Sequence, residues 1–125
     1  MKRAALFITL SLCLLSGCGR TLDPNADPAE ADKALRTALE AWKGGKSPDD
    51  LKQGRPPILM NEDDWRTGKR LLDYEMEKGS LSGRQVRCRV RIKLQGADGE
   101  AADREAVYII DTVPRIVIVR DSFAS

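Results

Sequence analysis

The sequence predicts an α+β fold in which one main N-terminal helix packs on a curved four-stranded antiparallel sheet. Two hydrophobic periods support this prediction: apolar residues recur at helical spacing between positions 31 and 42, and they alternate with polar residues from Thr67 onward. The first period is typical of an amphipathic helix and the second of half-buried strands. Residues 28–125 provide enough chain for a single domain but not for two.

A leader precedes this predicted domain. Met1, Lys2 and Arg3 form a basic start, and residues 4–15 are an almost unbroken apolar run. This order is typical of a signal peptide. The run of about a dozen residues is shorter than the roughly 20 that a membrane-spanning helix needs. We therefore expect residues 1–17 to be cleaved and no transmembrane helix to remain.

The leader ends in Leu15-Ser16-Gly17-Cys18, which resembles the lipobox of bacterial lipoproteins. The resemblance implies cleavage between Gly17 and Cys18, a diacylglyceryl group on the Cys18 sulfur and, usually, acylation of the new amine. Because Gly19 and not aspartate follows, it also implies sorting to the outer membrane, facing the periplasm, in a double-membraned cell. The alternative is an ordinary signal peptide with a coincidental cysteine. If the lipobox interpretation holds, residues 18–27 are the lipidated cysteine and a polar tether.

Net charge and cysteine content limit the partners and the disulfide bonds that we expect for this chain. Removal of Lys2 and Arg3 with the leader leaves 21 − 2 = 19 basic residues against 19 acidic ones. A neutral mature chain gives no reason to expect binding to nucleic acid or electrostatic attraction to anionic lipid. Cys88 is the only thiol left after Cys13 and Cys18, so no internal disulfide is expected. We expect Cys88 to be buried; the alternative is an intermolecular bridge or a reactive thiol.

The main helix has clear signals at both ends. Asp27 is the expected N-cap, Pro28 occupies the first turn, and Glu30 is placed to bond back to the cap. Gly44 and Gly45 end the helix. Its apolar face consists of Ala31, Leu35, Ala38 and Trp42. This face is expected to pack on the sheet.

A short helical turn and an extended segment follow. Ser47 to Gln53 begins with Ser-Pro-Asp-Asp, typical of a single helical turn. Pro56 and Pro57 then favour an extended chain through residues 58–60.

The first predicted hairpin has two consistent faces. In residues 85–95, apolar and basic side chains alternate, and the strand before it alternates apolar with acidic ones. Folding about Ser82 places Glu77, Glu75 and Asp73 opposite Arg87, Arg89 and Arg91, and places Met76, Tyr74 and Leu72 opposite Cys88, Val90 and Ile92. The acidic row makes a self-neutralised solvent face more plausible than a polyanion site.

Two more strands complete the predicted sheet. One runs from about Arg104 to Asp111, and the last from Arg115 to Arg120. The last is apolar throughout its middle, which indicates burial on both faces or contact with a partner.

The order of a helix followed by an antiparallel meander resembles the cystatin-like superfamily, particularly the nuclear transport factor two-like cone. The residues carrying this resemblance lie between Pro28 and Ser122; they are Ala41-Trp42-Lys43-Gly44-Gly45-Lys46, Trp65-Arg66-Thr67-Gly68, Leu72-Asp73-Tyr74, Pro114 and Val117-Ile118-Val119-Arg120. Members such as ketosteroid isomerase and scytalone dehydratase use Asp, Tyr or His inside the cone, and the resemblance implies a pocket lined by Trp42, Tyr74 and Tyr108.

Candidate catalytic and metal-binding residues are few. The chain has no histidine, which excludes histidine-based triads and general bases. Asp73 with Tyr74 and Asp111 with Tyr108 are carboxylate and phenol pairs, but alternation points the tyrosines inward and Asp73 outward, so we predict no enzyme. Asp49-Asp50 and Glu62-Asp63-Asp64 are candidate calcium ligands; acids in a first helical turn explain them better. We expect no metal and no cofactor. Trp42 and Trp65 are candidate stacking platforms, with packing between helix and sheet as the favoured role.

The sequence therefore predicts a membrane-anchored envelope lipoprotein that serves as a non-catalytic binding or assembly module. Its partners would be the membrane, through lipid on Cys18, and an envelope protein that contacts the exposed edge of the 115–120 strand or the grooves beside it. One alternative is a carrier with a small ligand in the Trp42, Tyr74 and Tyr108 pocket. The other is an isomerase-like or dehydratase-like enzyme.

Overall fold

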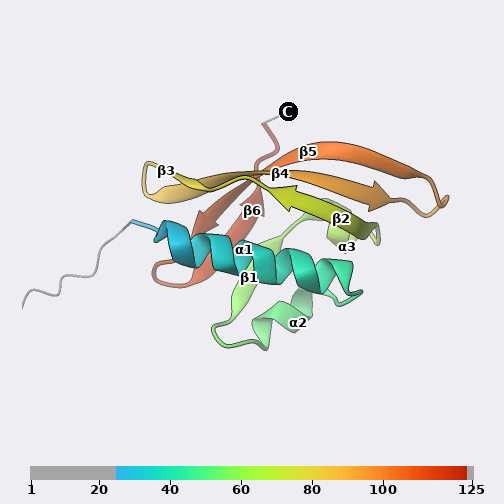
Figure 1. Cartoon of the computed structure of the whole chain (residues 1–125). Helices are drawn as coiled ribbons and strands as arrows, with labels where there is room; N and C mark the ends of the chain where they lie inside the picture. The colour runs from blue at the N-terminus through green and yellow to red at the C-terminus, as the bar shows by residue number, and fades with distance from the viewer. Residues whose placement is uncertain (1–24, 124–125) are drawn as a thin grey trace, which may run out of the picture.

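The computed structural model describes residues 25–123. The leader, Cys18 and most of the predicted tether lie outside this range, so the predicted signal peptide and lipidation site are not part of the structure described below. The elements in chain order are α1 (Pro28–Lys43), α2 (Pro48–Lys52), β1 (Ile58–Asn61), α3 (Asp63–Arg66), β2 (Arg70–Met76), β3 (Ser80–Ser82), β4 (Gln85–Gln95), β5 (Ala101–Asp111) and β6 (Ile116–Arg120) (Figure 1).

The fold is α+β, as predicted, but the sheet differs from the prediction. The described residues form six strands and not four, in the order β1-β6-β5-β4-β2, with the short β3 also paired to β4. The sheet is mixed because β1 runs parallel to β6, with Ile58 opposite Ile116. The two extra strands are β1, which is the extended segment after Pro56-Pro57, and β3, which comes just before the turn into β4. A parallel pair needs a long connection, and here that connection contains β2 to β5.

The helix α1 crosses one face of the sheet (Figure 1) and ends at Gly44, as predicted. Asp27 caps it, since its side chain accepts from the Ala29 N–H at 3.1 Å. The predicted return bond from Glu30 is wrong: the Asp27 N–H donates to Thr112 Oγ1 at 2.9 Å. This bond ties the start of α1 to the end of β5. The buried face of α1 consists of Ala31, Ala34, Leu35, Ala38, Leu39 and Trp42.

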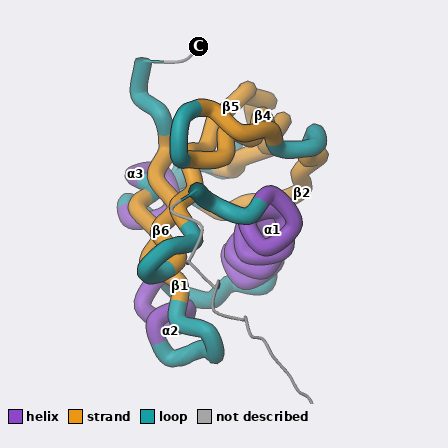
Figure 2. Tube along the Cα trace, turned by 90° about the vertical axis from the view of Figure 1, so that its left-hand side faces the viewer, coloured by secondary structure: helices purple, strands orange, loops and turns teal. Residues whose placement is uncertain are grey.

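Both small helices lie near the β1–β6 pair. In the turned view of Figure 2, α2 lies beside β1 at the end of the molecule and α3 lies beside β6, and Trp65 of α3 stacks on Trp42 at the end of α1. Both α2 and the strand at residues 58–61 are where the sequence predicts a turn and an extended segment. Among residues 25–123, no helix combines the length and apolar character needed to cross a bilayer.

The predicted inner face is correct for Tyr74 and Met76 and for β4, but the buried leucine of β2 is Leu71 and not the predicted Leu72. The predicted register is also wrong by two residues. Glu75 lies opposite Arg91 and Tyr74 opposite Ile92. The cause is β3, which pairs Ser80 with Arg87 and moves the turn to Gly83, where φ is +66°. A shift of two preserves the side-chain faces. The expected charge pairs are therefore replaced, and the ion pairs formed are Arg89 with Glu105 and Arg87 with Asp121.

One hydrophobic core joins α1 to the inner face of the sheet. Its fully buried members include Leu35, Leu39, Val90, Ile92, Tyr108 and Ile118. Cys88 is buried with them, as predicted, and burial raises the pKa of its thiol to about 11. The free edge predicted for residues 115–120 is wrong, because β6 lies between β1 and β5. Its inner side chains are buried and Val119 is 37% exposed, so only one of its faces is covered fully.

Candidate functional site

A buried carboxylate lies between the end of β1 and the start of α3. Glu62 is fully buried, and its side chain caps α3 by accepting from the Asp64 N–H at 3.0 Å. The same carboxylate accepts the Tyr108 hydroxyl at 2.5 Å and the Arg120 guanidinium at 2.9 Å. Burying a charge is costly unless it is paired and hydrogen-bonded. Glu62 meets this condition with three donors.

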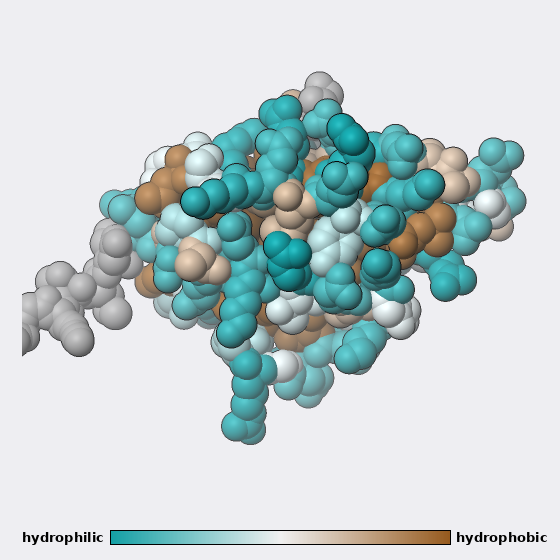
Figure 3. Space-filling view, viewed as in Figure 1, coloured by the Kyte–Doolittle hydropathy of each residue, from teal (hydrophilic) through white to brown (hydrophobic). Residues whose placement is uncertain are grey.

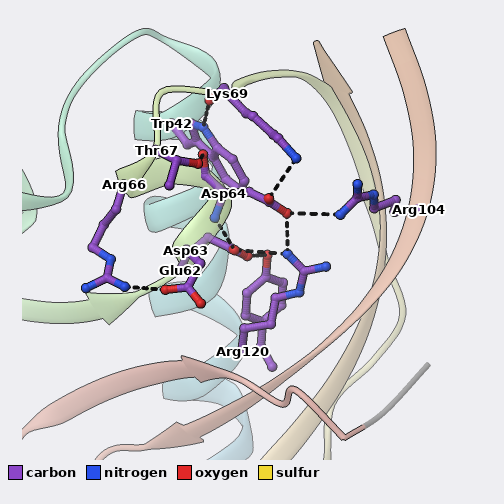
Figure 4. A network of polar contacts seen from close by, with 10 residues as sticks. Trp42, Glu62, Asp63, Asp64, Arg66, Thr67, Lys69, Arg104 and Arg120 are labelled. Atoms are coloured by element: carbon purple, nitrogen blue, oxygen red, sulfur yellow. Dashed lines mark hydrogen bonds and ion pairs between the residues drawn. The ribbon is translucent and has the colours of Figure 1, made fainter. Parts of the chain in front are cut away.

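Asp64 extends these contacts into what we call the Glu62 network: Glu62, Asp64, Lys69, Arg104, Tyr108 and Arg120. Asp64 lies 2.6 Å from the Arg120 guanidinium, 3.1 Å from the Lys69 ammonium and 3.5 Å from Arg104 (Figure 4). Burial opposes the charge on Asp64, but hydrogen bonds from Arg120 and Lys69 outweigh it and hold the pKa of this carboxyl below its usual value. The network joins α3 to β5 and β6.

The polar groups of this network are directed at one another. Burial, together with the charge of Glu62, raises the pKa of Tyr108 far above its usual value, so the phenol stays protonated and serves as a donor. General acid–base catalysis needs a proton-transferring group within reach of a substrate. A cavity of about 390 Å³ is lined by Glu62 and Asp64 together with Arg104 and Arg120, but the Glu62 side chain is fully buried and already accepts the Tyr108 hydroxyl. The arrangement is that of a structural connection.

The two tryptophans form a second connection nearby. Trp42 at the end of α1 and Trp65 in α3 are stacked, with ring centroids 5.5 Å apart and planes inclined by 12°. They are only 3% and 6% exposed, which confirms the predicted packing role. The Trp42 indole N–H donates to the Lys69 carbonyl at 2.8 Å, and that of Trp65 donates to the Lys46 carbonyl at 2.9 Å. The pair therefore fixes two loops at their backbones.

A cavity of about 820 Å³ opens between these loops, and we call it the β1-edge cavity. Leu59, Met60 and Asn61 of β1 all line it. Successive side chains of a strand point to opposite faces, so a cavity that touches three consecutive residues follows the edge of the strand. Other lining residues are Trp42, Trp65, Gly68 and Val117.

The charge of this cavity is strongly one-sided. Its lining includes five cationic side chains and one carboxylate: Lys46, Lys52, Arg66, Lys69, Arg70 and Asp49. Three of the cations have partners, since Lys52 lies 3.2 Å from Asp49, Lys69 lies 3.1 Å from Asp64, and Arg66 pairs with Asp63. Within residues 25–123, the side chains of Lys46 and Arg70 form no ion pair, and both residues are exposed. They are the cations available to a ligand.

Comparison with protein-family models, with curated proteins and with solved structures finds no match to this chain. The site is therefore interpreted from its geometry alone. No group of three or more acidic or cysteine side chains in the described part of the chain is placed to hold a metal ion. The predicted calcium candidates have other contacts: Asp49 pairs with Lys52, Asp50 accepts from the Ser47 N–H at 3.0 Å, and Glu62 and Asp64 belong to the network.

The structure separates the residues predicted to share a ligand pocket. Trp42 lines the β1-edge cavity, whereas Tyr74 and Tyr108 do not. The Tyr74 hydroxyl donates to Glu40 at 2.5 Å, on the exposed side of α1. Burial and, to a smaller extent, the contact with Glu40 raise the pKa of Tyr74. Tyr108 donates to Glu62 in the core. Each tyrosine therefore has its own partner.

The predicted carboxylate and phenol pairs are also separated. Asp73 has a side chain that is 71% exposed and lies 3.5 Å from Lys43. Asp111 accepts from Gln85 at 3.1 Å. The carboxylate partner of Tyr108 is Glu62, for which the sequence predicted a calcium-binding role or, preferably, a place in a first helical turn. Its signal was available, because alternation from Ile58 through Met60 places position 62 on the inner face.

Proposed function

We propose that this chain is a lipid-anchored protein of the cell envelope whose domain acts as a non-catalytic binding module. In this proposal the domain belongs to the cystatin-like class, which the placement of α1 across one face of the sheet supports (Figure 1). The anchor is the lipid on Cys18 implied by the lipobox. The envelope location follows from that anchor, with the outer membrane facing the periplasm as the expected site in a double-membraned cell.

The observation that carries the binding role is the contrast between the Glu62 network and the β1-edge cavity. The groups suited to proton transfer, Tyr108 and Glu62, are buried and bonded to each other. The open cavity instead presents Lys46 and Arg70 beside a fixed aromatic pair. Concave sites with a few placed polar groups are typical of ligand binding. Binding without chemistry is therefore the better-supported role.

The anchor accounts for membrane retention without help from protein charge. Each buried methylene of an acyl chain contributes about 0.8 kcal/mol, and two or more chains hold a protein firmly. The mature chain is formally neutral, with 19 basic and 19 acidic residues. We therefore expect retention on the membrane to depend on Cys18 and to withstand high salt.

Mass spectrometry of the native protein, combined with fractionation of cells, tests the anchor. We expect the mature N-terminus to be Cys18 carrying acyl groups, and we expect Cys18→Ala to release the domain from the membrane or block its maturation. Cys13→Ala is the matched control, because it changes a leader cysteine and should leave the anchor in place. An unmodified N-terminus at Cys18, or membrane retention of a processed Cys18→Ala protein in high salt, would overturn this part of the proposal.

A further inference from the structure

We propose that the β1-edge cavity binds an extended acidic segment of another protein, which pairs with the free edge of β1 and neutralises Lys46 and Arg70. This inference rests on the proposed binding function and names its partner chemistry. It replaces the expectation of contact through residues 115–120, since the structure makes β1 and β2 the outer strands of the main sheet path.

The backbone of β1 supplies the first argument. β1 pairs with β6 on one side only, and within the described chain no backbone hydrogen bond links Ile58–Asn61 to α2 or to the loops. A strand at the end of a sheet presents unpaired N–H and C=O groups, which an extended peptide can pair with. β1 has four residues, which at about 3.3 Å each span roughly 13 Å. A short segment is enough to cover this edge.

The charge of the cavity supplies the second argument. Lys46 lies just before α2 and Arg70 begins β2, and both line the β1-edge cavity, so a ligand in this cavity meets both free cations. Asp49, the one carboxylate among the lining residues, is already paired with Lys52. An acidic segment therefore meets two unpaired positive charges without a competing free carboxylate from the lining.

The backbone beside both cations is held in place before a ligand arrives. The Trp65 indole bonds the carbonyl of Lys46 itself, and the Trp42 indole bonds the carbonyl of Lys69, the residue before Arg70. The Lys69 ammonium is in turn held by Asp64 of the Glu62 network. A site that needs little reordering loses less entropy on binding. The stacked tryptophans and the Glu62 network thus hold the backbone that lines the cavity.

A peptide explains the site better than a lipid headgroup or a free anion does. A headgroup or phosphate can neutralise Lys46 and Arg70, but it has no row of amide donors and acceptors to match a strand edge. Leu59 and Val117 are also neighbours across the β1–β6 pair and line the same cavity. In an extended segment, side chains on one face can pack on Leu59 and Val117 while acidic side chains on the other face reach Lys46 and Arg70.

Fluorescence anisotropy with the full-length protein in a neutral detergent tests this inference. The probe is a labelled eight-residue peptide in which Glu and Thr alternate. We compare it with the same peptide carrying Gln for Glu and with a version of equal charge that is N-methylated at every residue. We expect the Glu peptide to bind and each of the other two to bind about ten-fold more weakly or worse, since one lacks charge and the other lacks amide donors.

Variants of the protein locate the binding. Lys46→Gln and Arg70→Gln should each weaken binding of the Glu peptide about three-fold to five-fold, as expected for loss of one exposed ion pair. Lys93→Gln, which removes an exposed lysine on β4 outside the cavity, is the matched control and should change the affinity by less than about two-fold. Circular dichroism and urea unfolding establish that each variant is folded.

Several results would overturn the inference. Equal binding of the N-methylated peptide would mean charge attraction without strand pairing. Displacement of the peptide by inorganic phosphate, or by micelles doped with phosphatidylglycerol, would assign the cations to an anion or a headgroup. Absence of binding would exclude the acidic segment and leave the lipid on Cys18 intact, whereas an unmodified Cys18 would remove the anchor and leave peptide binding intact.

Discussion

The Glu62 network and the β1-edge cavity use the same types of charged residue for different purposes. In the Glu62 network, Arg120 bridges Glu62 and Asp64, and the tyrosine and lysine around them complete the contacts. In the β1-edge cavity, Lys46 and Arg70 have no such partners within the described residues. The difference teaches that pairing, and not composition, separates a structural cluster from a binding surface. The mainly hydrophilic face in Figure 3 shows that charged residues alone do not mark a site on this molecule.

The largest expected effect comes from breaking the network at Arg120. Arg120→Leu would leave Glu62 and Asp64 without their shared cation. Removing one partner of a buried pair leaves an uncompensated charge, and since Arg120 is partly exposed we expect a loss near the lower end of the usual range, about 3 kcal/mol of unfolding free energy. Urea unfolding measures it. Arg89→Leu, which breaks the exposed pair with Glu105, is the control and should cost less than about 1 kcal/mol.

A smaller effect is expected at Tyr108. Tyr108→Phe would keep the ring in the core and remove one donor to the buried Glu62, at a cost of about 1–3 kcal/mol. Tyr74→Phe removes a hydroxyl whose partner Glu40 lies on the exposed side of α1, so its cost should stay below about 1 kcal/mol. Thermal and urea unfolding compare the two. Equal losses of unfolding free energy in both variants would contradict the account, because they would mean that burial of Glu62 does not increase the cost of removing its hydroxyl donor.

The smallest effect is a pH dependence centred on Asp64. Burial opposes its charge, but hydrogen bonds from Arg120 and Lys69 outweigh burial and lower the pKa of Asp64 in the folded protein below its ordinary value. The charged form is thus favoured by folding, and its contribution to stability is present above the unfolded pKa and is lost as the pH falls through the folded value. Asp64→Asn should therefore flatten the decline in unfolding free energy between neutral and strongly acidic pH. Asp63→Asn, on an exposed neighbour, should leave the decline nearly unchanged.

Local signals made much of the fold predictable. The start and end of α1 depend on Asp27, Pro28 and Gly44, which act over a few residues. The faces of β4 follow from alternation alone, and for this reason the burial of Cys88 was correct. The register was missed because it depends on β3, whose pairing leaves the alternation unchanged, and on an irregularity between Leu71 and Asp73, which reverses the alternation and turns Leu71 inward.

The site was harder to predict because it depends on distant pairings. Ile58 and Ile116 are far apart in the chain, and no local pattern in either segment specifies a parallel pair. Without that pair, β6 is mistaken for an edge strand and β1 for an extended segment outside the sheet. Lys46 and Arg70 matter because they lack partners in space, which composition does not reveal. Glu62 was the one member within reach, through its alternation with Ile58 and Met60.

The central claim is that the cations of the β1-edge cavity serve a ligand and not the fold. The urea-unfolding free energy of Lys46→Gln/Arg70→Gln, measured without peptide, tests it most directly. We predict a value within about 0.5 kcal/mol of the unsubstituted protein, as for surface changes away from structural contacts. A loss comparable to that of Arg120→Leu would contradict the claim, because it would show that Lys46 and Arg70 hold the structure together.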